Sequence, residues 1–131
     1  MSASVWAKND ELKIAYDSIP AAAQNFIKTN FEGVAVKKAY QMFDDGIAEY
    51  KVYLKNKIVI NFDMVGAWNY IETSKGVLPD AGFLPERVLD TVLARFADKK
   101  IKRLENDGYL YKVMFSDGSE VKINVNGTIV E

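Results

Sequence analysis

The chain of 131 residues contains no cysteine and no histidine. Without histidine it lacks the commonest general base of enzymes and the commonest metal ligand. Without cysteine it has no thiolate for catalysis or metal binding, which suits an oxidising compartment, although many cytosolic domains also lack cysteine. No apolar run approaches the roughly 18 residues that a membrane-spanning helix needs. We therefore expect no enzyme activity, no metal site, no cofactor and no membrane span.

The charges are balanced and dispersed. Lysine and arginine number 17 and aspartate and glutamate 18, which gives a net charge of -1. Because no basic block or stripe is present, we expect no nucleic-acid partner. Apolar residues make up 49% and charged residues 27%, the balance of an ordinary globular protein of one domain.

What the chain does contain is an internal repeat. A short motif of an aliphatic residue and proline, Ile19-Pro20, recurs 65 positions later as Leu84-Pro85. The segment 50–54 is echoed by 111–115, and we match 60–63 to 123–126. Each copy has the pattern of one helix followed by strands. Half a chain of this size cannot build a large core alone, so we expect the two halves to share one.

Periodicity supports the same organisation in both copies. Proline at the first turn predicts helices that open at Pro20 and Pro85. Beyond each helix the apolar period changes to two, and signals such as Asp117-Gly118 and Asn126-Gly127 predict tight turns between antiparallel strands. The second helix has the clearer apolar stripe, which comprises Leu84, Val88, Leu89, Val92, Leu93 and Phe96.

These patterns predict an α+β fold. Each repeat supplies one helix and an antiparallel β-meander, and together they form one curved antiparallel sheet of about eight strands with both helices packed on one face. We expect an N-terminal arm over residues 1–18 and a single domain over 19–131. That domain comprises repeats 19–72 and 84–131, joined by a linker over 73–83 that is rich in glycine and proline.

Carboxylates and amides at turns have an ordinary interpretation. Asp44, Asp45 and Asp63 coincide with turn signals, where aspartate bonds its own backbone, so we interpret them as turn residues and not as paired catalytic acids. The stretch 124–127 could suggest a calcium loop, but no bidentate acid follows at a suitable spacing. We interpret it as a hairpin.

The repeated unit resembles a known family. Each copy has an aliphatic residue and proline, an amphipathic helix, and a strand that begins Val36-Lys37 or Ile101-Lys102. Tyr-Lys-Val and an Asn-Gly or acidic turn follow. This order is similar to that of the PepSY-like domains. These are also described as β-lactamase-inhibitor-like, and the resemblance covers residues 12–131. It implies a tandem fold like that of the β-lactamase inhibitor protein, a periplasmic or secreted location and no catalytic residues. Two features depart from the pattern: Asn56-Lys57 in place of an Asp-Gly turn, and an insertion at Met64-Val65.

Four aromatic residues are the candidate binding site. Tyr40, Tyr53, Trp68 and Tyr70 could project from the wet face of the sheet as an aromatic patch, and exposed aromatic patches often mark partner surfaces. The alternative is that they pack beneath the linker or the N-terminal arm.

We therefore favour a non-catalytic exported module that recognises a protein or peptide through the open sheet face. A second hypothesis is a small-ligand carrier with an apolar cavity between helices and sheet, lined by residues such as Tyr50 and Tyr111. A third is an enzyme that uses only Asp, Glu, Lys or Tyr. The short terminal strand predicted over 128–130 could also leave an edge that accepts a partner strand or a second copy, so the oligomeric state stays open.

Overall fold

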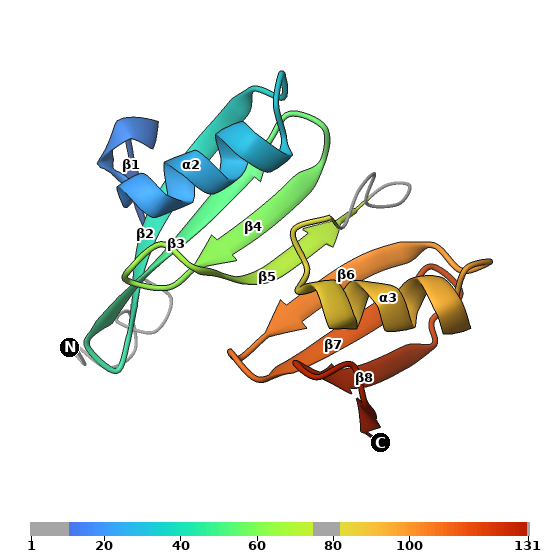
Figure 1. Cartoon of the computed structure of the whole chain (residues 1–131). Coiled ribbons are helices and arrows are strands. Elements are labelled where there is room, and N and C mark those ends of the chain that lie inside the picture. Colours follow the sequence, from blue (N-terminus) through green and yellow to red (C-terminus); the bar gives the residue numbers. More distant parts are fainter. Residues whose placement is uncertain (1–10, 75–81, 131) are drawn as a thin grey trace. The chain divides into compact units, whose positions relative to one another are not determined.

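The structure is a computed structural model that describes residues 11–74 and 82–130 (Figure 1). Its strands are β1 (Glu11–Ile14), β2 (Val36–Asp44), β3 (Ile47–Leu54), β4 (Ile58–Phe62), β5 (Trp68–Thr73), β6 (Ile101–Asn106), β7 (Leu110–Phe115), β8 (Glu120–Asn124) and β9 (Ile129–Val130). Its helices are the 3-10 helix η1 (Tyr16–Ser18), α2 (Ala21–Asn30) and α3 (Glu86–Arg95).

The described strands form one antiparallel sheet in the order β1 to β9, so each strand lies beside its neighbour in sequence. The α+β fold with two α-helices and an antiparallel meander is confirmed. Against the predicted eight or so strands the structure has nine, because the predicted N-terminal arm contains β1, which pairs with β2. That both helices lie on the same face of the sheet stays a prediction.

The chain divides into two compact units, Met1–Trp68 and Asn69–Glu131, and each is described by itself. The predicted single domain over 19–131 and its repeat boundaries stay predictions. Residues 1–10 of the predicted arm and 75–81 of the predicted linker lie outside the described residues.

In the first unit, α2 lies along one face of β2, β3 and β4 (Figure 1). The helix begins after Pro20, whose missing N–H costs nothing at a helix start. Ala23 and Ile27, four residues apart, are its buried face. The sheet residues below them alternate in burial and contribute the fully covered side chains of Val52, Ile60 and Phe62. One face of this part of the sheet is therefore packed against the helix.

The second unit repeats this plan. Helix α3 follows Pro85, has Glu86 in its first turn and Arg95 in its last, and so places both charges favourably in the helix dipole. Val88 and Val92 are its buried residues. The fully buried residues of β6, β7 and β8 are Leu104, Val113, Phe115 and Ile123.

The predicted apolar stripe of α3 is correct for its centre and wrong at one position. Val88 and Val92 are buried, whereas Leu93 is 59% exposed. Residue 93 is one step, or about 100°, around the helix from Val92, so it lies beyond the face that the sheet covers.

The turn after β4 in the first unit and the turn after β8 in the second show the true register of the repeat. The Asp63 side chain accepts hydrogen bonds from the backbone N–H groups of Val65 and Ala67, at 3.0 and 2.9 Å. The Asn124 side chain accepts the same two bonds from Asn126 and Thr128, at 2.9 and 3.1 Å. Asp63 therefore corresponds to Asn124, and the match of 60–63 to 123–126 was wrong by two residues. The turn interpretation of Asp63 and of 124–127 is confirmed.

The same register places both departures from the family pattern at turns that are equivalent in the two repeats. Met64-Val65 stands where the second unit has Val125-Asn126, so it is no insertion relative to the second repeat. Asn56-Lys57 stands where the second unit has Asp117-Gly118. Lys57 adopts a φ of 74° and Gly118 one of 91°, so both turns place the same position in the left-handed region.

The hairpin turn at Asp117 gives a prediction for acid pH. Asp117 accepts hydrogen bonds from Lys99 at 2.7 Å and from the Ser119 hydroxyl and backbone, which hold the pKa of its carboxyl well below the usual value of 3.8. An acid with a lowered pKa stabilises the fold above its unfolded pKa and loses that contribution as pH falls below it. In Asp117→Asn we expect the unfolding midpoint in urea to fall less steeply below about pH 4 than in wild type. Equal slopes for the two proteins would contradict this role, and Lys99→Gln should flatten the curve in part.

Candidate functional site

Two predicted binding residues meet on the open face of the first unit. In β2 and β3, Tyr40 lies opposite Lys51, and Lys38 lies opposite Tyr53. The rings of Tyr40 and Tyr53 are 5.9 Å apart between centroids at an interplanar angle of 80°, an edge-to-face contact. Both side chains are half-buried, and they alternate with the buried Ala39 and Val52. The pair therefore lies on the face opposite α2.

Lysines flank this pair. The Lys38 ammonium lies 4.9 Å from the ring centroid of Tyr53 and 5.7 Å from that of Tyr40. The Lys51 ammonium lies 5.9 Å from the Tyr53 centroid and 3.6 Å from a carboxylate oxygen of Glu11. Within the part of the chain that the structure describes, Lys38 makes no ion pair. We call Lys38, Tyr40, Lys51 and Tyr53 the tyrosine patch, a surface that offers aromatic area, hydroxyl groups and positive charge.

Trp68 does not belong to the tyrosine patch. Its side chain is only 8% exposed, and its ring centroid lies 6.3 Å from that of Phe26 in helix α2. Phe26 also contacts Phe31 and Phe62, so these rings form one cluster between helix and sheet. The expectation that Trp68 could project from the wet face was wrong, because the large indole fills space beneath the helix.

Tyr70 belongs to the second unit, and its polar group is occupied. Its hydroxyl donates a hydrogen bond to the Glu72 carboxylate, and the Arg103 guanidinium lies 6.0 Å from its ring centroid. Burial, aided by Glu72, raises the pKa of Tyr70 above its usual value. Of the four predicted residues, the structure thus brings Tyr40 and Tyr53 together and assigns the other two different surroundings.

The structure has an apolar pocket, but the tyrosines that were predicted to line a carrier cavity do not line it. Tyr111 is 7% exposed and Tyr50 is half-buried, and neither lines that pocket. The pocket has a volume of about 380 Å³ and lies at the end of α2, where Ile27, Phe31 and Val36 are among its lining residues. The carrier hypothesis stays a prediction.

The described residues offer little for catalysis. A general acid at neutral pH needs a raised carboxyl pKa. The pKa of the Asp107 carboxyl is lowered by hydrogen bonds from the backbone N–H groups of Leu110 and Tyr109. The pKa of the Asp117 carboxyl is lowered by hydrogen bonds from Lys99 and Ser119. No group of three or more acidic side chains among residues 11–74 and 82–130 could hold a metal ion. No helix in the same ranges is long and apolar enough to cross a membrane.

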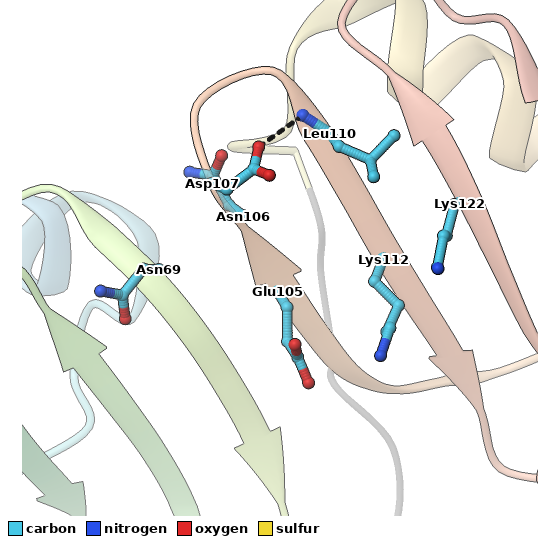
Figure 2. A pocket seen from close by; sticks show the side chains of 7 residues that line it. All are labelled: Asn69, Glu105, Asn106, Asp107, Leu110, Lys112 and Lys122. Carbon is cyan, nitrogen blue, oxygen red and sulfur yellow. Dashed lines mark hydrogen bonds between the residues drawn. The ribbon is translucent and has the colours of Figure 1, made fainter. Parts of the chain in front are cut away.

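A second, polar pocket lies on the second unit (Figure 2). Its volume is about 270 Å³, and it is lined by Asn69, Glu105, Asn106, Asp107, Leu110, Lys112 and Lys122. We did not predict this pocket. The sequence signal for it is weak, because alternating charged residues are the usual pattern of any wet strand face.

The fold and the patch together define a small α+β protein whose open sheet face carries aromatic and cationic side chains. The family described as "Putative beta-lactamase-inhibitor-like, PepSY-like" matches residues 48–131. The chain belongs to this PepSY-like family, whose function is unknown, and the resemblance seen in the sequence is confirmed.

Solved structures from Bacteroides share the fold. A "putative calcium-regulated periplasmic protein" from Bacteroides thetaiotaomicron is 25% identical, with a TM-score of 0.84 over 94% of this chain and 96% of that one. A "putative periplasmic protein" from Bacteroides vulgatus is 27% identical, with the same TM-score and coverage. Another from Bacteroides vulgatus, of unknown function, is 21% identical, with a TM-score of 0.83 over 93% of this chain and 98% of that one. Among curated proteins none matches this chain.

Proposed function

We propose that the protein is a non-catalytic binding module that recognises a protein or peptide through the tyrosine patch. The observation that carries the proposal is the edge-to-face pair of Tyr40 and Tyr53 on the sheet face opposite α2. Tyrosine supplies a large, rigid contact area together with a hydroxyl group, and it is enriched among the residues that dominate protein interfaces. The ammonium of Lys38, which has no ion pair in the described ranges, favours a partner with an acidic residue near the contact.

We propose further that the protein acts in the periplasm or outside the cell. The similar structures are described as periplasmic proteins, and a chain without cysteine suits an oxidising compartment. Calcium regulation is a description of one similar protein only. The absence of an acidic cluster in the described ranges gives no reason to extend it to this chain.

The test is partner capture by the immobilised protein. A periplasmic extract of a Bacteroides species is passed over wild type and over Tyr40→Thr/Tyr53→Thr, and retained proteins are quantified by mass spectrometry. Threonine keeps a high strand propensity while it removes both rings. We expect the captured partner to fall at least about tenfold, since loss of two interface tyrosines typically costs more than about 1.4 kcal/mol of binding energy.

The matched control is Tyr109→Thr, which removes an exposed tyrosine, 56% accessible, from the second unit. It should capture the same partner as wild type does. The double variant should also keep its fold, with a loss of about 1.5 kcal/mol or less from the aromatic contact. Undiminished capture by a folded Tyr40→Thr/Tyr53→Thr protein would refute the proposed surface.

A further inference from the structure

The polar pocket of the second unit has an unusual arrangement of charge. Glu105, Lys112 and Lys122 project from the adjacent strands β6, β7 and β8, and Asp107 lies in the turn between the first two (Figure 2). The pairing places Glu105 opposite Lys112 and Lys112 opposite Lys122. Their neighbours Val113 and Ile123 are fully buried, so the pocket lies on the face opposite α3.

The two lysines are poorly neutralised. Like charges directly opposite one another on neighbouring strands repel. Lys112 has one carboxylate partner, Glu120, with 3.7 Å between its ammonium nitrogen and the carboxylate oxygen. Lys122 makes no ion pair with any described residue. The β7–β8 side of the pocket therefore attracts an anionic group.

The other side of the pocket is negative. Glu105 is 3.4 Å from the Arg103 guanidinium and does not pair with Lys112. One Asp107 oxygen accepts hydrogen bonds from the backbone N–H groups of Tyr109 and Leu110, at 3.0 and 2.8 Å. These bonds lower the pKa of the Asp107 carboxyl and so keep it ionised. The Glu105 carboxylate points away from Asp107, which lies at the turn (Figure 2), so Glu105 is the acid placed to meet a ligand cation, and the four charges of the pocket sum to zero.

We propose that this pocket binds a small zwitterion, an amino acid or short peptide, with its carboxylate at Lys112 and Lys122 and its ammonium at Glu105. A dianion such as phosphate fits less well, because the two carboxylates repel it. Asn69 supplies an amide group that can donate and accept. The volume of about 270 Å³ suits a ligand of this size. This site does not depend on the tyrosine patch.

The test is a titration of the ¹⁵N-labelled full chain with L-alanyl-L-alanine, followed by NMR. We expect the amide signals of residues 105, 112 and 122 to shift in a saturable way. The N-acetylated dipeptide lacks the ammonium and the C-terminal amide lacks the carboxylate. Each should bind about tenfold or more weakly, because each loses a charge-assisted hydrogen bond. Inorganic phosphate should bind more weakly than the dipeptide.

The variant Lys122→Gln removes one carboxylate contact and relieves the repulsion with Lys112. It should weaken dipeptide binding about tenfold without lowering the unfolding midpoint. Lys100→Gln, an equal charge change at an exposed residue that does not line the pocket, should bind as wild type does. The proposal is overturned if both blocked dipeptides bind as well as the zwitterion, if phosphate binds more tightly, or if no saturable shift occurs.

Discussion

Replacing Gly127 by alanine should destabilise the protein by about 3 kcal/mol. Gly127 adopts a φ of 89°, which an alanine reaches only with strain. A Cβ placed there would also lie 2.8 Å from the Arg87 carbonyl oxygen of α3, and a backbone atom cannot yield without moving the helix. The turn and the helix are further joined by the Thr91 hydroxyl, which donates to the Gly127 carbonyl at 2.6 Å.

Gly66 makes the equivalent approach in the first unit. A Cβ there would lie 2.9 Å from the Ala23 backbone nitrogen of α2, so Gly66→Ala should cost a similar amount. The matched control is Gly118→Ala. Gly118 has a φ of 91° but no atom within 4 Å of the added Cβ, so only the backbone strain of about 1 kcal/mol remains.

Chemical denaturation of the three variants measures these costs. The difference between Gly127→Ala and Gly118→Ala isolates the close approach of turn and helix. If the two variants lose equal stability, the turns do not hold the helices onto the sheet in the way described.

Replacing Trp68 by alanine should destabilise the fold by about 3–5 kcal/mol, the usual cost of emptying a large buried aromatic site. The indole is 8% exposed and packs against Phe26 of α2. Removing it leaves a cavity beneath the helix and also removes a partner from the cluster with Phe31 and Phe62. Differential scanning calorimetry should show a markedly lower Tm.

Trp68→Phe is the conservative comparison, because it restores most of the apolar volume and should recover a large part of the loss. Tyr53→Thr gives the contrast on the opposite face, with a smaller loss of about 1.5 kcal/mol or less. An unaltered Tm in Trp68→Ala would mean that the indole is not part of the core.

Much of the architecture follows from local patterns. The short-range signals are proline at the two helix starts, the change of apolar period after each helix, and the Asp-Gly and Asn-Gly turns. They predicted both α-helices and the antiparallel meander. The register of the repeat was harder. Apolar alternation is nearly unchanged by a shift of two residues, so it did not reveal the correct match of Asp63 to Asn124, which their side-chain bonds show.

The binding face was only partly predictable. Tyr53 alternates cleanly with Val52 and Leu54, and its outward direction follows from that alternation. Trp68 begins a strand directly after a turn. Trp68 and Ile71 are both buried although they are three positions apart, an odd number, so simple alternation fails there. A large apolar ring then goes where a helix can cover it, which no local pattern specifies.

The polar pocket could not be predicted for a different reason. Glu105, Lys112 and Lys122 have the charged, alternating pattern of solvated strand residues. Their meeting depends on the pairing of three strands, which puts the two lysines opposite one another. Only the register turns an ordinary pattern into a charge-separated site.

The central claim is that the face of the sheet that bears the tyrosine patch is open, while the other face, with Trp68, is sealed by the helix. Fluorescence of the Trp6→Phe variant tests this directly, because Trp68 is then the one indole in the chain. We predict short-wavelength emission that acrylamide barely quenches. Emission like that of free tryptophan in water, with efficient quenching, would contradict the claim.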